Sequence, residues 1–188
     1  MSFFVNKMKG ANAMFSHFLV GSLVFLLSGE VYNLEITKMF LMFGVFWATV
    51  SDPISLIISR TVKLNKWSHT HRDNLSHSIF FSVIVLIVVI FFDFKVAIMV
   101  SVATLTHPLL DLFGIGWGVK LFYPYSNKTY KAFYKGQVLV VWSQEEVDAL
   151  VAKHGDDDWF WNIFLKPNLT IVFEGLCLIG ALALVIMN

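Results

Sequence analysis

The chain carries five residues of metal-binding type, three histidines and two aspartates, at widely separated positions: His17, Asp52, His77, His107 and Asp111. Imidazole nitrogens and carboxylate oxygens are common ligands of divalent cations such as Zn²⁺. Because Cys177 is the only cysteine, neither an intrachain disulfide nor a thiolate cluster can form. A metal site in this chain would therefore use nitrogen and oxygen ligands.

The spacing of these residues favours a shared site. His107 and Asp111 are four residues apart, so on a helix they lie on one face and could point at one ion. Taken singly, each residue has a structural alternative: a histidine in an apolar helix can be a hydrogen-bonded packing residue, and Asp52, which precedes a proline, can be a helix-end residue. Charged groups inside the hydrocarbon boundary cost free energy unless they are paired, and a shared cation would pair Asp52 with Asp111. The combination therefore predicts a joint metal site.

The elements that must position these residues are membrane helices. Of the 188 residues, 57% are hydrophobic and 14% are charged, and the mean hydropathy is +0.70. Since roughly 20 apolar residues cross a bilayer, the stretch Ser78–Phe113 is predicted to form two spans with a tight turn at Asp93–Lys95. We therefore expect an all-α fold, a polytopic membrane helical bundle with about five transmembrane helices, as one domain over residues 1–188. The other apolar stretches are approximately Ala11–Ser28, Ile36–Val50 and Leu169–Met187.

Basic residues indicate how the bundle is oriented, because cytoplasmic loops hold the excess of Lys and Arg. Of the 14 Lys and Arg residues, only Lys38 and Lys95 fall near the side opposite to the N-terminus. We therefore expect a multi-pass protein of the cell (inner) membrane with a cytoplasmic N-terminus. No small-x-small cleavage site follows the first apolar segment, which favours a membrane anchor over a cleaved signal peptide. In this topology the five candidate ligands lie within about two helical turns of the cytoplasmic face.

A cytoplasmic insertion is predicted at about residues 114–168. Gln137–Trp142 has the β-branched, apolar character of a short strand. Ser143 and Glu146 form a capping-box pattern for a helix from about Gln144 to Lys153. We therefore expect a small cytoplasmic cap. The formal net charge of +1 gives no support for nucleic acid as a partner, whereas the basic inner loops suit an anionic lipid surface.

The segment Ser68–Ser78 carries a family resemblance. It contains His71, Arg72 and His77 and resembles the HR…SHS signature of the membrane-bound metal-dependent hydrolases of the YdjM-like inner-membrane family, and of a related group of membrane metal-binding proteins. The resemblance extends in order to Ser16-His17, Asp52-Pro53 and the segment from His107 to Asp111. It implies a helical fold similar to zinc-dependent phospholipase C and P1-type nucleases, in which His and Asp hold metals that cleave phosphate esters.

The chain departs from the YdjM-like pattern at two places. The pattern has two aspartates at the end of the second helix, whereas Val50 or Ile54 stands in the second place here. The interval from His71 to His77 is also one residue longer and fits the related metal-binding group. These departures favour, as an alternative, a non-catalytic metal-binding or regulatory membrane protein; a cation transporter is a further alternative.

The resulting functional hypothesis is a hydrolase of phosphate esters that uses a divalent metal ion, zinc by preference. The metal would activate bound water, and Asp52 or Asp111 could serve as the base. Arg72 offers a planar donor fork for phosphate, and the amides around Ser76–Ile79 would favour an anion at a helix start. The substrate expected at this depth is a phospholipid or a lipid-linked phosphate. The predicted metal ligands are His17, Asp52, His71, His77, His107 and Asp111.

Overall fold

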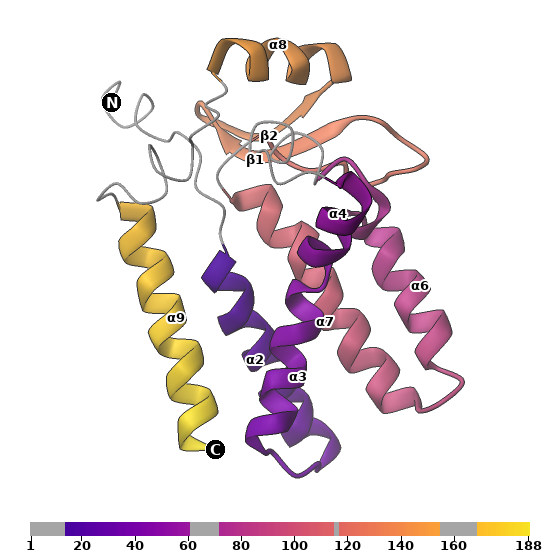
Figure 1. The fold of residues 1–188 in the computed structure, drawn as a ribbon, viewed down its shortest axis with the longest axis vertical. Coiled ribbons are helices and arrows are strands. Elements are labelled where there is room, and N and C mark those ends of the chain that lie inside the picture. Colours follow the sequence, from indigo (N-terminus) through magenta and orange to yellow (C-terminus); the bar gives the residue numbers. More distant parts are fainter. Residues whose placement is uncertain (1–13, 61–71, 115–116, 155–168) are drawn as a thin grey trace.

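The computed structural model describes residues 14–60, 72–114, 117–154 and 169–188. Within these residues the fold is mostly helical, with one short two-stranded sheet (Figure 1). The helices are α2 (Met14–Tyr32), α3 (Lys38–Thr49), α4 (Ser51–Ser59), the 3₁₀ helix η1 (Leu75–His77), α6 (Ile79–Val89), α7 (Phe94–Phe113), α8 (Gln144–His154) and α9 (Leu169–Met187). The strands are β1 (Thr129–Tyr134) and β2 (Gln137–Trp142).

Five helices, α2, α3, α6, α7 and α9, run side by side along the long axis of the molecule (Figure 1). Helix α2 packs against α3, α7 and α9, and α7 also packs against α3 and α6. The apolar core between them includes Phe25, Leu41, Met99 and Val100. Large apolar side chains also cover the outside of the bundle, for example Ile87 on α6. An apolar core together with an apolar exterior is the arrangement expected of helices surrounded by lipid.

Two helices are long and apolar enough to cross a membrane on their own, α2 over Phe15–Tyr32 and α7 over Phe94–Phe113. Helices α3 and α4 pass the same test together, although they are bent by 43° at a break. The described residues therefore hold two such spans, or up to three. Helix α6 and the segment Ile171–Met187 of α9 are apolar but shorter, so the expected count of about five spans stays a prediction.

The end of the second apolar helix differs from the sequence prediction. Asp52, before Pro53, is interpreted from the sequence as a possible helix-end residue, whereas the chain bends at Val50 and continues as α4 to Ser59. Pro53 is tolerated because it lies in the first turn of α4, where a backbone N–H has no partner within the helix. Asp52 lies in the same first turn, where the helix dipole favours a negative charge.

A tight turn separates the third and fourth apolar helices as predicted, but it lies at Ile90–Asp93 instead of Asp93–Lys95, because Phe94 and Lys95 already belong to α7. Helix α6 ends at Val89 and α7 begins at Phe94. Asp93 is the N-cap of α7, and its Oδ1 accepts a hydrogen bond from the amide of Val96 at 2.8 Å. This cap satisfies an amide that the first turn of the helix leaves without a partner, and it stabilises the turn.

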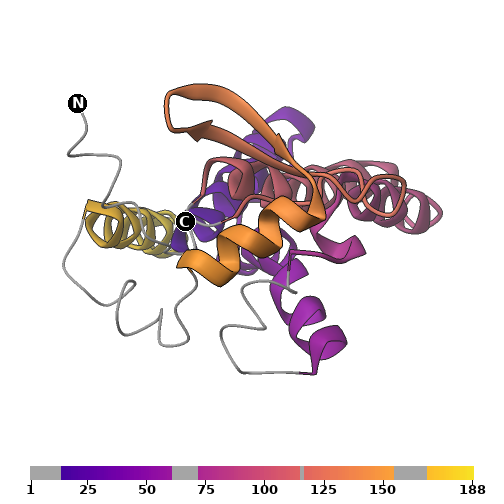
Figure 2. The same cartoon turned by 90° about the horizontal axis from the view of Figure 1, so that it is seen from above.

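A cap made of β1, β2 and α8 covers one end of the bundle, and Figure 2 shows the hairpin lying across the helix ends. The strands are antiparallel, with Thr129 opposite Trp142. Lys135 and Gly136 form the turn with φ values of 48° and 85°, the positive values that a two-residue hairpin requires. The fold is therefore not strictly all-α. The predicted strand at Gln137–Trp142 is confirmed as β2, while its partner β1 was not predicted.

The helix of the cap agrees with its predicted start. The amide of Ser143 donates to Glu146 Oε2 at 2.7 Å, and the amide of Glu146 donates to Ser143 Oγ at 3.3 Å. These two bonds form the predicted capping box. Helix α8 begins at Gln144 as expected and ends one residue later than expected, at His154.

Candidate metal centre

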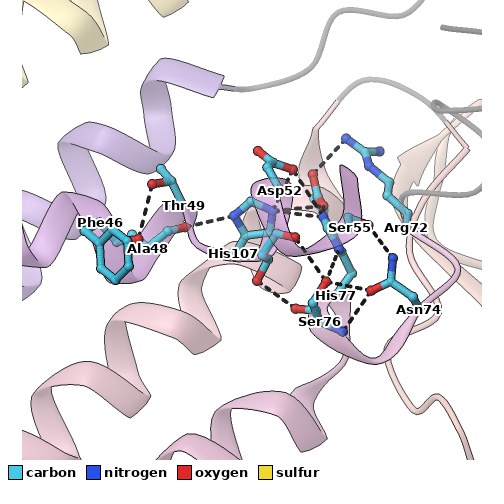
Figure 3. A network of polar contacts seen from close by, with 12 residues as sticks. Phe46, Ala48, Thr49, Asp52, Ser55, Arg72, Asn74, Ser76, His77 and His107 are labelled. Carbon is cyan, nitrogen blue, oxygen red and sulfur yellow. Dashed lines mark hydrogen bonds and ion pairs between the residues drawn. The ribbon is translucent and has the colours of Figure 1, made fainter. Parts of the chain in front are cut away.

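Asp52 of α4, His77 of η1 and His107 of α7 meet at the capped end of the bundle (Figure 3). His77 Nε2 lies 3.1 Å from His107 Nε2. Asp52 Oδ1 lies 3.4 Å from each of these nitrogens. One ligand atom from each residue falls within 4.8 Å of the others, so the three side chains could hold a single metal ion.

Hydrogen bonds between the start of α4 and η1 place two of these ligands side by side. Ser51 Oγ donates to the carbonyl of Ser76 at 2.7 Å, and Ser76 Oγ lies 3.1 Å from the carbonyl of Ser51. Asn74 caps η1 through Oδ1, which accepts from the amide of Ser76 at 2.9 Å. Asp52 follows Ser51 and His77 follows Ser76, so this pairing fixes the separation of their side chains.

Helices α2 and α3, which approach each other closely, both contact the third ligand, His107. A Cβ at Gly21 would lie 2.6 Å from the carbonyl oxygen of Gly44, a contact that only two glycines allow. One turn further along α3, the carbonyl of Ala48 lies 2.8 Å from His107 Nδ1. One turn before Gly21, the ring of His17 stacks on that of His107, with centroids 4.1 Å apart and an interplanar angle of 17°. The His107 ring is thus held on two sides.

The hydrogen bond to Ala48 defines the proton on His107. A carbonyl oxygen can only accept, so Nδ1 carries a proton and a neutral ring presents the Nε2 lone pair to the cluster. Metal-binding histidines commonly donate their second N–H in this way. The short distance between the Nε2 atoms of His77 and His107 requires a proton or a metal cation between them, because two lone pairs repel each other.

The spacing of the ligand atoms fits a tetrahedral ion. Bonds of about 2.0–2.2 Å to such an ion separate neighbouring ligand atoms by about 3.3–3.6 Å. The observed separations in the cluster are 3.1, 3.4 and 3.4 Å. The side chains of Asp52, His77 and His107 therefore have the donor types and nearly the spacing that zinc requires.

Asp111 connects this cluster to Arg72. Its Oδ1 lies 2.7 Å from Arg72 Nη2, and both side chains are buried. Its Oδ2 lies 3.8 Å from His77 Nε2 and 3.9 Å from His107 Nε2. Within the described part of the chain, this buried Oδ2 has no hydrogen-bond partner. Asp111 is thus placed to give the cluster a fourth ligand atom, its Oδ2, while its Oδ1 holds the guanidinium of Arg72.

Of the other residues predicted for the site, those that the structure describes are not members of the Asp52–His77–His107 cluster. His17 contacts the cluster through its ring face, and its buried Nδ1 has no hydrogen-bond partner among the described residues. His71 lies outside the described residues. Arg72, predicted to bind phosphate, is paired with Asp111. The ligand and catalytic roles assigned from the sequence stay predictions.

The predicted anion site at the amides of Ser76–Ile79 is wrong. All four amides already donate hydrogen bonds: two to Asn74, and the other two to the carbonyl oxygens of Leu75 and Leu121. An anion would have to displace these bonds, which also hold η1 and the start of α6 in place. Any anion-binding group of this centre must therefore come from elsewhere.

Sequence reasoning missed Lys131 of β1, whose side chain is buried. Burial, and to a lesser extent the positive charge of Arg72, lower the pKa of the Lys131 ammonium to about 7, while the charge of Asp111 partly opposes this shift. Both charges act on Lys131, so it belongs to the electrostatic surroundings of the candidate centre. The turn at Lys135 and Gly136, between two runs of β-type residues, was the signal that could have revealed β1.

The apolar helices and the buried His and Asp donors define a membrane protein with a candidate metal site. The model of the YdjM inner membrane protein family matches residues 13–187, and the chain belongs to this family. The family resemblance inferred from the HR…SHS segment is therefore confirmed. Neither the comparison with curated proteins nor the comparison with solved structures gives a match.

Proposed function

We propose that the chain is a membrane-bound, metal-dependent hydrolase that acts on phosphate esters. The observation that carries this proposal is the convergence of Asp52, His77 and His107, whose ligand atoms lie within 4.8 Å of one another. Buried titratable groups that meet from separate segments cost folding free energy, so they are typical of functional sites. Because the ligand atoms are imidazole nitrogens and a carboxylate oxygen, the metal would be a cation that binds nitrogen and oxygen ligands.

Zinc is the proposed metal, because imidazole and carboxylate ligands at tetrahedral spacing suit it. When bound, the metal would lower the pKa of a coordinated water and polarise a phosphoryl oxygen. Asp52, His77 and His107 would hold it, with Asp111 Oδ2 as the fourth protein atom within reach. Among the described residues, the group of converging ligands contains histidine and aspartate but no cysteine.

The two aspartates differ in their access to water, which supports different roles. The side chain of Asp52 is 30% exposed, whereas that of Asp111 is 3% exposed and paired with Arg72. Asp52 can therefore accept a proton from an attacking water at the open side of the cluster. Asp111 would orient Arg72, whose planar guanidinium suits the oxygens of a phosphate.

The proposed location of the chemistry is the cytoplasmic side of the inner membrane. The cluster lies at the end of the bundle beneath the cap, and the excess of basic residues favours a multi-pass topology with that end and the N-terminus in the cytoplasm. At this depth a phospholipid headgroup or a lipid-linked phosphate could reach Asp52 without leaving the membrane surface. Such a lipid is the substrate class that we propose.

The test uses full-length protein purified in detergent, stripped with a chelator and reloaded with zinc. We expect zinc binding by elemental analysis and zinc-dependent cleavage of chromogenic phosphodiesters or phosphomonoesters. The variant His107→Ala should lose both, while Asp148→Asn, which alters an exposed carboxylate of α8, should keep both. Failure of the wild-type protein to bind any divalent metal would overturn the proposal.

A non-catalytic metal-binding or regulatory protein is the second candidate. It is favoured by the apolar residue, Val50 or Ile54, at the place of a second aspartate. It is also favoured because, among the described residues, the ligands form one group of three. Zinc binding that is lost in His107→Ala, without turnover of any phosphate ester, would select this candidate.

A further inference from the structure

Lys131 is a buried cation without a partner among the described residues. Its side chain lies on β1 with a relative exposure of 6%, and its Nζ has no hydrogen-bond partner in that part of the chain. Burying an ammonium group away from water costs free energy unless an anion or a set of acceptors compensates it. The position therefore suggests that Lys131 has a partner that does not belong to the described chain.

A second buried lysine, Lys120 in the segment between α7 and β1, shows how such a group is satisfied within the protein. Lys120 Nζ lies 3.1 Å from Asp73 Oδ2, and the exposure of the Lys120 side chain is 8%. Lys120 and Lys131 thus have similar burial, but among the described residues Lys120 has a carboxylate against it and Lys131 Nζ has no hydrogen-bond partner. Burial does not by itself explain why Lys131 Nζ has no hydrogen-bond partner in the described part of the chain.

A second polar group lies on the same face of β1. Thr129 and Lys131 are two residues apart on the strand, so their side chains point to the same side of the sheet. Thr129 Oγ1 is also buried, and it too has no hydrogen-bond partner among the described residues. An ammonium and a hydroxyl are both hydrogen-bond donors, and together they suit an anion that has several oxygens.

The face that carries Lys131 is turned toward the candidate metal centre. Strand β1 packs against α7, which contributes His107 and Asp111 to the centre. The charges of Arg72 and Asp111 both act on Lys131. Since Arg72 is paired with Asp111, this ion pair does not balance a positive charge on Lys131.

We propose that Lys131, together with Thr129 and Arg72, forms an anion subsite that binds a phosphate group beside the Asp52–His77–His107 cluster. The subsite takes the place of the helix-start amides, which are occupied by hydrogen bonds within the chain. A phosphate oxygen on Lys131 Nζ would compensate the buried ammonium and hold the phosphorus against the cluster. This inference rests on the proposed function for the identity of the anion as part of the substrate.

The test compares wild-type protein with Lys131→Met and Lys135→Met, all full-length and in a phosphate-free detergent. Lys135 lies on the same hairpin and is exposed, so it is a matched control for the loss of one positive charge. Calorimetric titrations would use zinc alone, then inorganic phosphate with and without zinc, then phosphatidic acid in mixed micelles. We expect Lys131→Met to bind inorganic phosphate about tenfold or more weakly, with unchanged zinc affinity, and Lys135→Met to match the wild type.

Each outcome decides the inference. Equal phosphate affinity in wild type and Lys131→Met overturns it, as does an equal loss in Lys135→Met. If both Lys131→Met and Lys131→Gln fail to fold, Lys131 is structural and the inference is also overturned. Phosphatidic acid binding that depends on Lys131, without inorganic phosphate binding, would identify the lipid headgroup as the source of the anion.

The zinc-binding, phosphate-binding and hydrolysis measurements together also distinguish the anion subsite from the proposed hydrolase function. Phosphate binding that requires Lys131 in a protein that takes up no zinc would support the subsite and overturn the metal-dependent hydrolase. Zinc-dependent hydrolysis with full activity in Lys131→Met would support the hydrolase and overturn the subsite.

Discussion

Two buried carboxylates of the bundle, Asp111 on α7 and Glu174 on α9, lie in similarly apolar helices but in different surroundings. Glu174 Oε2 accepts hydrogen bonds from the amides of Phe15 at 2.6 Å and Ser16 at 3.0 Å. It therefore caps the start of α2 from a neighbouring helix. Asp111 instead contacts Arg72 and points its second oxygen at two histidines.

The comparison shows that a buried acid in a membrane helix is not in itself a sign of chemistry. Glu174 meets backbone amides, which every helix start provides, and the contact joins α9 to α2. Asp111 meets side chains whose types are rare inside a bilayer and costly to bury there. The partners of the carboxylate, more than its burial, distinguish a structural acid from one that belongs to a candidate site.

The largest expected effect is loss of metal when a ligand of the cluster is removed. His107→Ala deletes one of the three converging ligand atoms, so we expect zinc affinity to fall by about 100-fold or more. Competition with a chelating dye would measure this affinity in detergent. The comparison predicts the opposite for Glu174→Ala, which should keep wild-type zinc affinity; a large loss there would show that Glu174 also belongs to the metal centre.

A smaller effect is expected when Arg72 is changed to Lys. The ammonium can still neutralise Asp111, but the planar fork that suits a phosphate is lost. We expect kcat/KM for a phosphate ester to fall about tenfold, with zinc content unchanged. A parallel loss of zinc and activity would mean that Arg72 acts mainly by holding Asp111 in place.

The meeting of distant ligands could be predicted from the sequence, because consecutive antiparallel helices return to the same end of a bundle. Hydropathy and basic residues placed Asp52, His77 and His107 near one end, and the structure brings their ligand atoms together. Which ring nitrogen faces the cluster was not predictable. It depends on the packing of α3 against α7, which brings the carbonyl of Ala48 to His107, and no local sequence pattern encodes that pairing.

The cap was predictable only in part. The capping box of Ser143 and Glu146 and the β-branched run of β2 are local signals, and both are confirmed. Lys131 was counted only as a basic loop residue, because an inward-facing lysine contradicts the usual alternation of a half-exposed strand. The bend at Val50 was missed for a related reason: Pro53 indicates a helix end or a helix start equally well.

A moderate effect on stability, without an effect on metal, is expected at the Glu174 junction. Glu174→Ala removes the acceptor of two amides at the start of α2, which should lower the free energy of unfolding by about 1–2 kcal/mol. Glu174→Gln keeps a side-chain oxygen for these amides and should cost less. Denaturant titration in detergent, followed by tryptophan fluorescence, would measure both variants. Equal stability of Glu174→Ala and wild type would show that this cap contributes nothing.

The last expected effect is a pH-dependent gain in stability for Lys131→Met in the absence of phosphate. The pKa of Lys131 is about 7 in the folded protein, against an ordinary value of 10.5 for a lysine, so folding disfavours the charged form. The unfolded chain then binds more protons between these two values, and wild-type stability should rise as pH increases from 7 to 10.5. Below pH 7 the penalty is fully present.

Lys131→Met removes this penalty, because methionine fills a similar space without a charge. The variant should therefore melt a few degrees above the wild type at and below pH 7, and the difference should shrink as pH approaches 10.5. Saturating inorganic phosphate should raise the melting temperature of the wild type and not that of the variant. A variant that is less stable than the wild type at pH 7 would place Lys131 with Glu174, among the buried charges that hold the fold together.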